Sequence, residues 1–449
     1  MTKHGHELAE GETRARAGDV LEVAVERIVP GGAGLGHAGG LTLFVPLAAP
    51  GDRLRVRVER VKGRVGFAAL VEILEAGADR VEPPCPYFGR CGGCDFQQLS
   101  YEAQLRAKVE IVSDCLRRIA RLAPPAEIRI TPSPSEWAYR SRARWQHDAR
   151  NHRLGYYELA SHRVCDVDVC PVVLPEVQGA LTRLRAAFVD DHTRGDFDPA
   201  NAGETRAENA AAAVVSHPPP HDNRRGDADA RGHAAAIEFQ AVAGDDGVSL
   251  LPPLAEGDRH ERVRTVAGER YTFDAECFFQ INHALLEPLV AAAVGGARGA
   301  SAVDLYCGVG LFTLPLARRF ARVHGVEGNA GAARYARRNL SDATLSNASI
   351  ETAPVGDWLL RRAHTLAPAD FVLLDPPRAG AAEAVEGILA LRPRRIAYVS
   401  CDPATLARDL RALADGGYAL DSVAAFDMFP QTHHVETVAR LSRADGATP

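Results

Sequence analysis

The feature that most constrains the fold of this chain is an alternation of short apolar segments with helical segments that begins near residue 300. The segments AVDLY, RVHGVE, ASIET, DFVLLD and RRIAYVS have the length of strands, and AGAARYARRNL, AEAVEGILAL and PATLARDLRALAD have apolar residues at helical spacing. This alternation is typical of a doubly wound parallel sheet, in which the helices cover both faces. We therefore predict a Rossmann-like α/β domain over residues 276–449, whose tail forms two strands joined by a turn.

The N-terminal part of the chain predicts a different architecture. Residues 19–75 alternate apolar and polar side chains in short runs, and PGGAGLG forms a turn between two of them. Such runs have the size of an OB-like β-barrel, which we place at residues 15–76.

Two further regions lie between these domains. We expect a small β-rich central domain over residues 77–185 and 237–275, with a helix in SYEAQLRAKVEIVSDCLRRIARL. Residues 186–236 are polar, rich in Ala, Pro, Asp and Gly, and have no periodicity. We expect this segment to be a disordered insertion.

Charge placement is more informative than the formal net charge of −6, which by itself argues against a nucleic-acid partner. Residues 138–163 contain six arginines against Asp148 and Glu158, whereas residues 190–231 carry an excess of acidic side chains. No run of about 18 apolar residues is present, and the N-terminus has no signal-peptide core. We expect a cytoplasmic protein without a membrane partner.

A nucleoside pocket is indicated where the first strand of the α/β domain ends. In DLYCGVGLF, Gly308 and Gly310 follow the strand, but Thr313 breaks the dinucleotide pattern GxGxxG. Glu327 ends the next strand, where an acid accepts hydrogen bonds from ribose hydroxyls. A short loop that has no pyrophosphate to bind suits S-adenosylmethionine (SAM) better than NAD. A tight turn without a ligand is the alternative.

A second loop at the same edge of the sheet is LLDPPR, at residues 373–378. Its two prolines stiffen the chain after a strand and hold Asp375 where open α/β sheets bind ligands. The alternative is a rigid turn in which Asp375 is only a cap.

Three cysteines, Cys85, Cys91 and Cys94, stand close together in CPYFGRCGGC. In a reducing compartment such a cluster favours a metal over disulfides. A fourth thiolate is available from Cys165 or Cys170 in CDVDVCP. The uneven spacing favours a 4Fe–4S cluster, with zinc as the alternative.

The last feature is YVSCDPATLARD, in which Cys401 ends a strand and precedes a helix that starts at Pro403. A helix N-terminus favours the thiolate form of a cysteine, although a buried packing role is equally compatible with this stretch. A thiolate beside SAM suggests addition to carbon 6 of a pyrimidine, which makes carbon 5 able to accept a methyl group. Glu436 in HHVETV is a candidate base for the proton on carbon 5, unless it is an exposed strand acid.

Together these motifs resemble the SAM-dependent RNA uracil-5-methyltransferases over nearly the whole chain outside 190–236. The resemblance implies that CFFQIN contributes a SAM contact, that Cys401 is the nucleophile and that Glu436 is the base. It also implies a TRAM domain at the N-terminus and a 4Fe–4S cluster in which Cys170 is the fourth ligand and Cys165 is left over. The implied cofactor-binding residues are Gln280, Tyr306, Glu327 and Asp375, and the implied cluster ligands are Cys85, Cys91, Cys94 and Cys170.

The resemblance makes RNA the expected partner of a monomeric enzyme. A TRAM-like module favours 23S ribosomal RNA over the transfer-RNA T-loop, by analogy only. The arginines and aromatic residues of YRSRARW are expected to hold phosphates and stack bases, or else to form a solvated face: Tyr139, Arg140, Arg142, Arg144 and Trp145. A methylase of exocyclic amines and a non-enzymatic iron–sulfur RNA binder remain alternatives.

One departure from the family pattern is Asp402, where many members have Asn. A carboxylate next to the nucleophile should raise the pKa of the Cys401 thiol, so the role of Asp402 is left open by the sequence.

Overall fold

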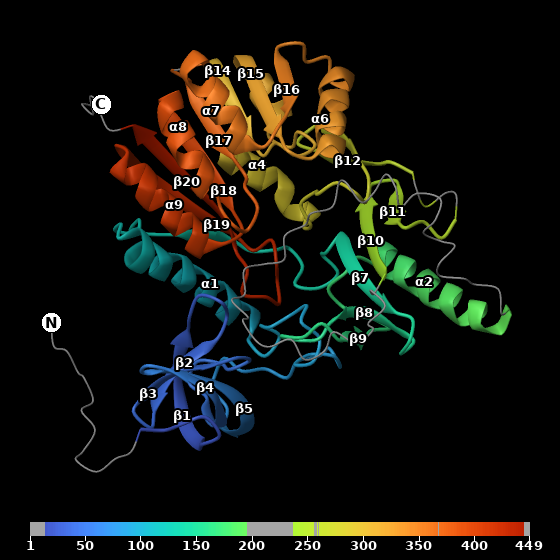
Figure 1. Cartoon of the computed structure of the whole chain (residues 1–449), viewed down its shortest axis with the longest axis vertical. Helices are drawn as coiled ribbons and strands as arrows, with labels where there is room; N and C mark the ends of the chain where they lie inside the picture. The colour runs from blue at the N-terminus through green and yellow to red at the C-terminus, as the bar shows by residue number, and fades with distance from the viewer. Residues whose placement is uncertain (1–13, 195–236, 256–257, 259, 367, 444–449) are drawn as a thin grey trace.

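The computed structural model describes residues 14–194, 237–255, 258, 260–366 and 368–443. Figure 1 shows a small barrel at one end, a large helix-covered sheet at the other, and a third β-rich region beside them. Most of the segment predicted to be a disordered insertion lies outside the described residues.

The N-terminal region is a closed five-stranded barrel, as the alternating pattern predicts. Its inward side chains form one apolar core that includes Val23, Leu43 and Val56, because successive residues of a strand point to opposite faces. The barrel order is β1 (Val20–Ile28), β2 (Gly34–Ala38), β3 (Leu41–Val45), β5 (Val65–Glu75) and β4 (Arg53–Lys62).

The large sheet has the order β16-β15-β14-β17-β18-β20-β19-β6. Its first five strands are parallel, and β20 then pairs antiparallel with β18, which confirms the predicted Rossmann-like α/β architecture. The strands are β14 (Gly299–Leu305), β15 (Phe320–Glu327), β16 (Ala348–Thr352), β17 (Phe371–Leu374), β18 (Arg395–Ser400), β19 (Tyr418–Phe426) and β20 (Glu436–Arg443).

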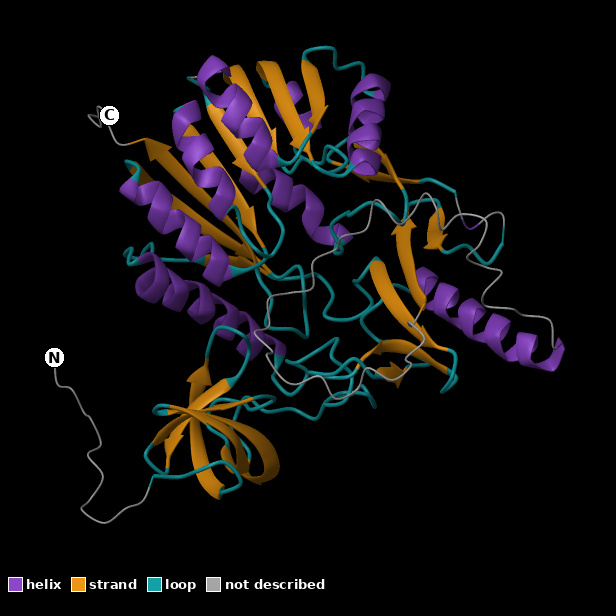
Figure 2. Cartoon of the chain, in the orientation of Figure 1, coloured by secondary structure: helices purple, strands orange, loops and turns teal. Residues whose placement is uncertain are grey.

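Helices cover this sheet on both faces, as Figure 2 shows. Strand order reverses between β14 and β17, and such a reversal opens a crevice at the carboxyl ends of the strands. The helices are α4 (Leu286–Val294), α5 (Thr313–Ala317), α6 (Ala330–Asp342), α7 (Val355–Leu366), α8 (Val385–Leu391) and α9 (Pro403–Asp415).

Helix α1 (Tyr101–Cys115) packs on the large sheet rather than within the central domain. Ser100 caps the helix by accepting a hydrogen bond from the N–H of Ala103, and a π-helical turn, Leu116–Ala120, follows it. Strand β6 (Arg129–Thr131) then joins the edge of the large sheet beside β19. The apolar side of α1 is buried against α9, which is why this part differs from the predicted domain division.

The third region is built around a five-stranded sheet of order β11-β10-β7-β8-β9. Helix α2 (Pro175–Arg194) packs on it and continues beyond residue 186, where we had expected the insertion to begin. A hairpin of β12 and β13 connects this region to the large sheet. The strands are β7 (Arg142–Asp148), β8 (Arg153–Tyr157), β9 (Val164–Asp166), β10 (Ile237–Gly244), β11 (Gly247–Leu251), β12 (Arg262–Val266) and β13 (Glu269–Phe273).

A search for membrane-crossing helices among the described residues finds none of sufficient length and apolar character.

Candidate active site

Strand register brings the candidate nucleophile and the candidate base together. Ser400 at the end of β18 pairs with Thr437 of β20, and the Thr437 hydroxyl donates a hydrogen bond of 2.8 Å to the Ser400 carbonyl. Cys401 directly follows this pair after β18, and Glu436 directly precedes it as the first residue of β20, so the two residues lie at the same end of the strand pair. Residues in register on antiparallel strands present their side chains on the same side of a sheet.

The Glu436 carboxyl is buried, and neither of its oxygens has a hydrogen-bond partner among the described residues. Burial, followed by the nearby charge of Asp375, raises its pKa well above the usual value of a glutamate. A fully buried carboxyl without partners is costly unless it binds something, so this group is available to a ligand.

The Cys401 thiol has a pKa raised to about 12, first by burial and then by the charge of Glu436. Arg378 acts in the opposite direction and favours the thiolate. Burial and nearby carboxyl groups thus oppose the thiolate form of Cys401, whereas Arg378 and the N-terminus of α9 favour it.

Asp402 occupies the N-terminus of the helix that follows Cys401. It is the N-cap of α9, and its Oδ1 accepts hydrogen bonds of 2.9 Å from the N–H groups of Ala404 and Thr405. The carboxylate therefore satisfies the free amides of the helix, which is a common role for Asp at this position. Its charge still adds to the raised pKa of the Cys401 thiol.

Asp375 lies beside this pair, directly after β17. Its Oδ2 accepts a hydrogen bond of 3.2 Å from the Gln280 amide, whose own oxygen is buried without a partner in the described structure. Burial raises the pKa of Asp375 to about 7. The fully buried Asp304, at the end of β14, has a pKa raised to about 8 by burial, and it accepts a hydrogen bond from Thr313.

The glycine loop after β14 closes the other side of the crevice. Tyr306, Gly308 and Gly310 all have positive φ angles, of 61°, 55° and 96°. This conformation turns the N–H of Gly308 toward Glu327, whose carboxylate accepts from it at 2.8 Å. Tyr306 is a non-glycine residue in a left-handed conformation, which is a feature of functional loops. Its buried hydroxyl has no partner in the described residues.

The structure thus places Asp375 near Gln280 and Glu327 and also near Cys401 and Glu436. Sequence reasoning missed two residues here. Arg378 is exposed at the end of the DPPR loop, where it influences the Cys401 thiol. Phe278 is 59% exposed although it is a large apolar side chain two residues before Gln280. Its only sequence signal was its place in CFFQIN.

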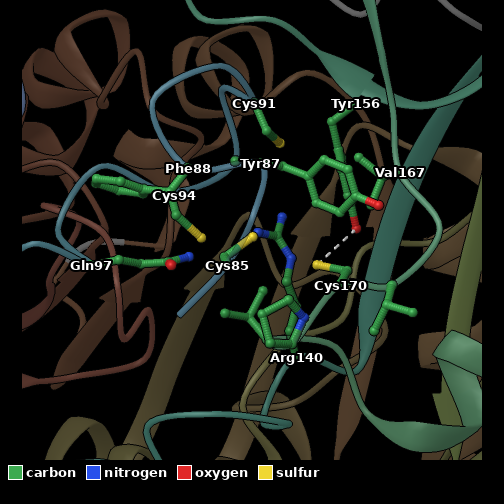
Figure 3. Close-up of a pocket in the computed structure, with 14 residues that line it drawn as sticks. Cys85, Tyr87, Phe88, Cys91, Cys94, Gln97, Arg140, Tyr156, Val167 and Cys170 are labelled. Carbon is green, nitrogen blue, oxygen red and sulfur yellow. Dashed lines mark hydrogen bonds between the residues drawn. The ribbon is translucent and has the colours of Figure 1, made fainter. Parts of the chain in front are cut away.

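The predicted cluster cysteines line a common cavity. Figure 3 shows Cys85, Cys91 and Cys94 from one loop and Cys170 from another, with Arg140 and Tyr156 in the same lining. Cys165 does not line this cavity; it is buried, and its sulfur accepts a hydrogen bond of 3.2 Å from Arg90. Burial raises the pKa values of the Cys91 and Cys94 thiols to about 12.

This donor set fits a soft metal centre better than it fits disulfides, because the thiols are free and converge from two loops. In the described residues, however, no three metal-binding side chains lie close enough together to hold one ion. Four thiolates around one zinc ion would have to approach within about 2.3 Å of it. The cavity is also small, about 30 Å³ in this conformation, so the side chains must turn outward to admit a cluster.

The basic strand YRSRARW is mostly structural, and the predicted base-stacking role of its aromatic residues is wrong. Trp145 is 0% exposed, and Tyr139 is buried with its hydroxyl donating to the Pro430 carbonyl. Arg142 is also buried. It donates hydrogen bonds to the carbonyls of Ala275 and Cys277, and these bonds hold the segment that precedes Gln280. Two arginines remain, namely Arg140 in the cysteine cavity and Arg144 on the surface.

Comparison with known proteins identifies what this arrangement resembles. The model of the tRNA (Uracil-5-)-methyltransferase family matches residues 100–444, and that of the TRAM domain matches residues 14–71. The chain is 35% identical to the 23S rRNA (uracil(1939)-C(5))-methyltransferase RlmD of Pectobacterium atrosepticum, with 93% of each chain covered. An RNA methyltransferase of Halalkalibacterium halodurans, itself uncharacterized, is 34% identical over 94% of this chain and 97% of that protein.

Among solved structures, the fold is similar to that of the Pyrococcus abyssi tRNA (uracil-54, C5)-methyltransferase in complex with S-adenosyl-L-homocysteine. The TM-score is 0.66 and the identity is 25%, with 93% of this chain and 100% of that chain covered.

Proposed function

Because the chain belongs to the family of SAM-dependent RNA uracil-5-methyltransferases, we propose that it methylates carbon 5 of a uridine in 23S ribosomal RNA through a covalent adduct of Cys401. The observation that supports the covalent mechanism is the pairing of Ser400 with Thr437, which brings the neighbouring residues Cys401 and Glu436 within electrostatic reach, with the Glu436 oxygens unpaired among the described residues. The enzyme would act in the cytoplasm.

The preference for ribosomal RNA rests on two supports. Relatives at 33–35% identity are 23S rRNA methyltransferases, and they align with over nine-tenths of this chain. The N-terminal barrel matches the TRAM domain. A transfer-RNA substrate is the second candidate, because the similar Pyrococcus abyssi structure is a tRNA methyltransferase.

In the first step, the Cys401 thiolate adds to carbon 6 of the flipped-out uracil, and the electrons of the carbon 5–carbon 6 double bond move onto carbon 5 and the carbonyl oxygen at carbon 4. Carbon 5 then attacks the methyl carbon of SAM. The new carbon–carbon bond forms as the carbon–sulfur bond breaks, and S-adenosylhomocysteine is the leaving group. The Cys401 thiol must first give up its proton, which passes to solvent; burial and the charge of Glu436 raise the pKa of the thiol and oppose this loss, and Arg378 favours it. The sulfonium of SAM supplies a positive charge in this crevice.

In the second step, Glu436 removes the proton from carbon 5, the double bond reforms, and the Cys401 thiolate is released. Glu436 must be a carboxylate to do this, and burial, which raises its pKa, opposes that ionisation. A high proton affinity makes the carboxylate a strong base once it is ionised.

The remaining crevice residues bind SAM in this proposal. The Glu327 carboxylate, fixed by the N–H groups of Gly308 and Asn329, accepts from the ribose hydroxyls. Gln280 and Asp375 lie close to the reacting centre through their mutual hydrogen bond. Because the oxygen of the Gln280 amide is unpaired among the described residues, it is free to accept from the substrate or from SAM.

We further propose that Cys85, Cys91, Cys94 and Cys170 hold a 4Fe–4S cluster. A cluster offers each thiolate its own iron, which suits thiols that line one cavity without meeting at a single point. No step of uracil methylation transfers an electron to it, so its role is structural: it would join the loop of Cys85–Cys94 to the loop of Cys170.

The decisive experiment supplies labelled SAM and RNA from a strain that lacks this protein. We expect label in 23S ribosomal RNA at one uridine, located by primer extension or mass spectrometry of nuclease fragments. Label only in transfer RNA would favour the second candidate, and label in an exocyclic amine would contradict the proposed chemistry.

A further inference from the structure

The loop that leads into Glu436 runs from Asp427, directly after β19, to Val435, and buried side chains of a helix far away in the sequence hold it. That helix is α1, which lies between the barrel and the large sheet (Figure 1). The loop is mostly buried, and its Gln431 has a φ of 68°, in the left-handed region that residues other than glycine seldom adopt. Such a conformation persists only where the surrounding contacts enforce it.

A buried ion pair joins α1 to the start of this loop. The ammonium group of Lys108 donates hydrogen bonds to Oδ1 of Asp427 and, at 3.0 Å, to the carbonyl of Phe429. Both side chains of the ion pair are 0% exposed. Such a pair adds little net stability, because taking two charges out of water costs about as much as their attraction returns. It does fix geometry, because either charge would be left buried and unpaired if its partner moved away.

A second contact from α1 holds the middle of the loop. The Gln104 side chain accepts from the N–H of Gln431 at 2.9 Å and donates to the side-chain oxygen of the same residue at 3.0 Å. Gln104 is itself buried. Because residues four apart lie on one face of a helix, Gln104 and Lys108 present their polar groups to the loop from the same side of α1. The reciprocal pair enforces the left-handed conformation of Gln431.

Two further segments fasten the rest of the loop. The Tyr139 hydroxyl donates a hydrogen bond of 2.8 Å to the Pro430 carbonyl. The Asp95 carboxylate accepts from the N–H of His433 at 2.9 Å, three residues before Glu436. All of these partners precede residue 276 in the sequence, so side chains outside the α/β domain hold a loop that belongs to it.

The Glu436 side chain has no comparable support of its own. Its two oxygens have no hydrogen-bond partner among the described residues, so its position depends on the backbone that carries it. A general base must lie within hydrogen-bond reach of the proton that it removes. A displacement of about 1 Å, caused by a change far from the reacting atoms, can lower a rate about 100-fold.

We propose that Lys108 and Gln104 are positioning residues for the base: they hold the 427–435 loop so that Glu436 reaches the proton on carbon 5. This rests on the proposed function, in which Glu436 removes that proton after methyl transfer. The earlier steps, addition of Cys401 to carbon 6 and methyl transfer, do not use the base. Loosening the loop therefore slows release of the product from Cys401 and leaves formation of the methylated complex unchanged.

Two variants loosen the loop in different ways. Lys108→Met combined with Asp427→Leu replaces the ion pair by two apolar side chains, a change that often preserves stability. Gln104→Met removes the reciprocal amide pair alone, and it tests the same loop if the double variant does not fold. The matched control is Ile111→Val, which shortens a buried apolar side chain of α1 in the core of the large sheet.

The first readout is a single turnover of the full-length protein with labelled SAM and ribosomal RNA from a strain that lacks it. The covalent protein–RNA complex is followed over time by denaturing electrophoresis. In both loosened variants we expect the labelled complex to form at the rate of the parent and to decay about 10- to 100-fold more slowly. Ile111→Val should match the parent in both steps, and SAM binding in calorimetry should be the same in all four proteins.

The second readout is hydrogen–deuterium exchange without RNA and without SAM. We expect the peptide that contains residues 427–435 to exchange about tenfold faster in both loosened variants, because its amides lose the contacts that protect them. Exchange of the same peptide in Ile111→Val should equal that of the parent.

Decay of the complex at the rate of the parent in both loosened variants would overturn the proposal. Equal slowing of formation and decay would also overturn it, because a general structural role predicts that result. A parent that forms no complex would reject the proposed function, and hydrogen exchange then decides separately whether α1 holds the loop. Unchanged exchange over residues 427–435 in both variants would show that it does not.

Discussion

Cys401 directly follows Ser400, which pairs with Thr437, and the charge of Glu436, the residue before Thr437, acts on the Cys401 thiol although 34 residues of sequence separate the two. Burial and then the charge of Glu436 raise the pKa of the Cys401 thiol, whereas burial and then the charge of Asp375 raise the pKa of Glu436. Arg378 opposes both shifts, so a positive charge near this pair favours the ionised form of each group.

Removal of the nucleophile should abolish turnover. We expect Cys401→Ala to lower the methylation rate on the order of 10⁴-fold or more, because the variant lacks the thiol that adds to carbon 6 in the proposed mechanism. Binding of SAM, measured by calorimetry, should change little. Cys115→Ala is the matched control, since Cys115 is a buried free cysteine on α1, and it should retain activity. Methylation by Cys401→Ala at the rate of the parent would refute the covalent mechanism.

Removal of the base should halt the reaction after methyl transfer. We expect Glu436→Gln to accumulate a covalent protein–RNA complex that survives denaturing electrophoresis, with turnover reduced about 10²- to 10⁴-fold. The complex should be absent in the double variant with Cys401→Ala. Glu386→Gln, an exposed glutamate on α8, serves as the control and should turn over normally. Free turnover by Glu436→Gln would eliminate Glu436 as the base.

Arg378 should set the reactivity of the Cys401 thiol. Its positive charge favours the thiolate, so Arg378→Gln raises the pKa of the thiol further above its ordinary value. At a fixed pH below that pKa we expect alkylation of Cys401 by iodoacetamide to slow about 3- to 10-fold, followed by mass spectrometry of the peptide. Arg411→Gln on α9 is the control, because Arg411 pairs with Asp415. Equal alkylation rates in the parent and Arg378→Gln would show that Arg378 does not act on the thiol.

The buried acid Asp375 should make the stability of the SAM-free protein fall as pH rises. Its folded-state pKa is raised from 3.8 to about 7, so the folded state binds more protons than the unfolded chain between these values. The stabilising contribution is complete below about pH 4 and is lost as pH rises through 7.

Asp375→Asn removes this proton uptake. We expect a higher Tm than the parent at pH 8, a smaller difference at pH 5, and SAM binding weakened at least about tenfold in calorimetry. Asp342→Asn, which alters an exposed acid at the end of α6, should leave both properties unchanged. A Tm difference that does not depend on pH would contradict the assignment.

The cysteine cavity predicts which thiols a cluster needs. Anaerobically purified protein should be brown and absorb near about 400 nm, and Cys170→Ser should lose this absorbance together with its iron. Cys165→Ser should keep both, because Cys165 lies outside the cavity lining. A colourless parent that contains zinc, or loss of iron in Cys165→Ser alone, would count against the proposed ligands.

The sequence determined those features that depend on local pattern. Alternating apolar residues specify the barrel strands, because a strand that is buried on one face alternates apolar and polar side chains. Short apolar runs between helices specify the parallel sheet, because a strand that is buried on both faces is apolar throughout. The sequence also predicted that Gly308, Glu327 and Asp375 lie at one edge of the sheet, because the carboxyl ends of parallel strands are on the same side.

Only the tertiary structure decided what depends on contacts between distant segments. Arg142 and Trp145 have the pattern of a nucleic-acid surface but are buried, because β10 and the segment before Gln280 cover them. The cavity lining, which includes Cys170 and not Cys165, depends on the path of two loops, and the pKa of the Cys401 thiol depends on which charges surround it. Burial and electrostatic neighbours are properties of the packed chain, and no period in the sequence encodes them.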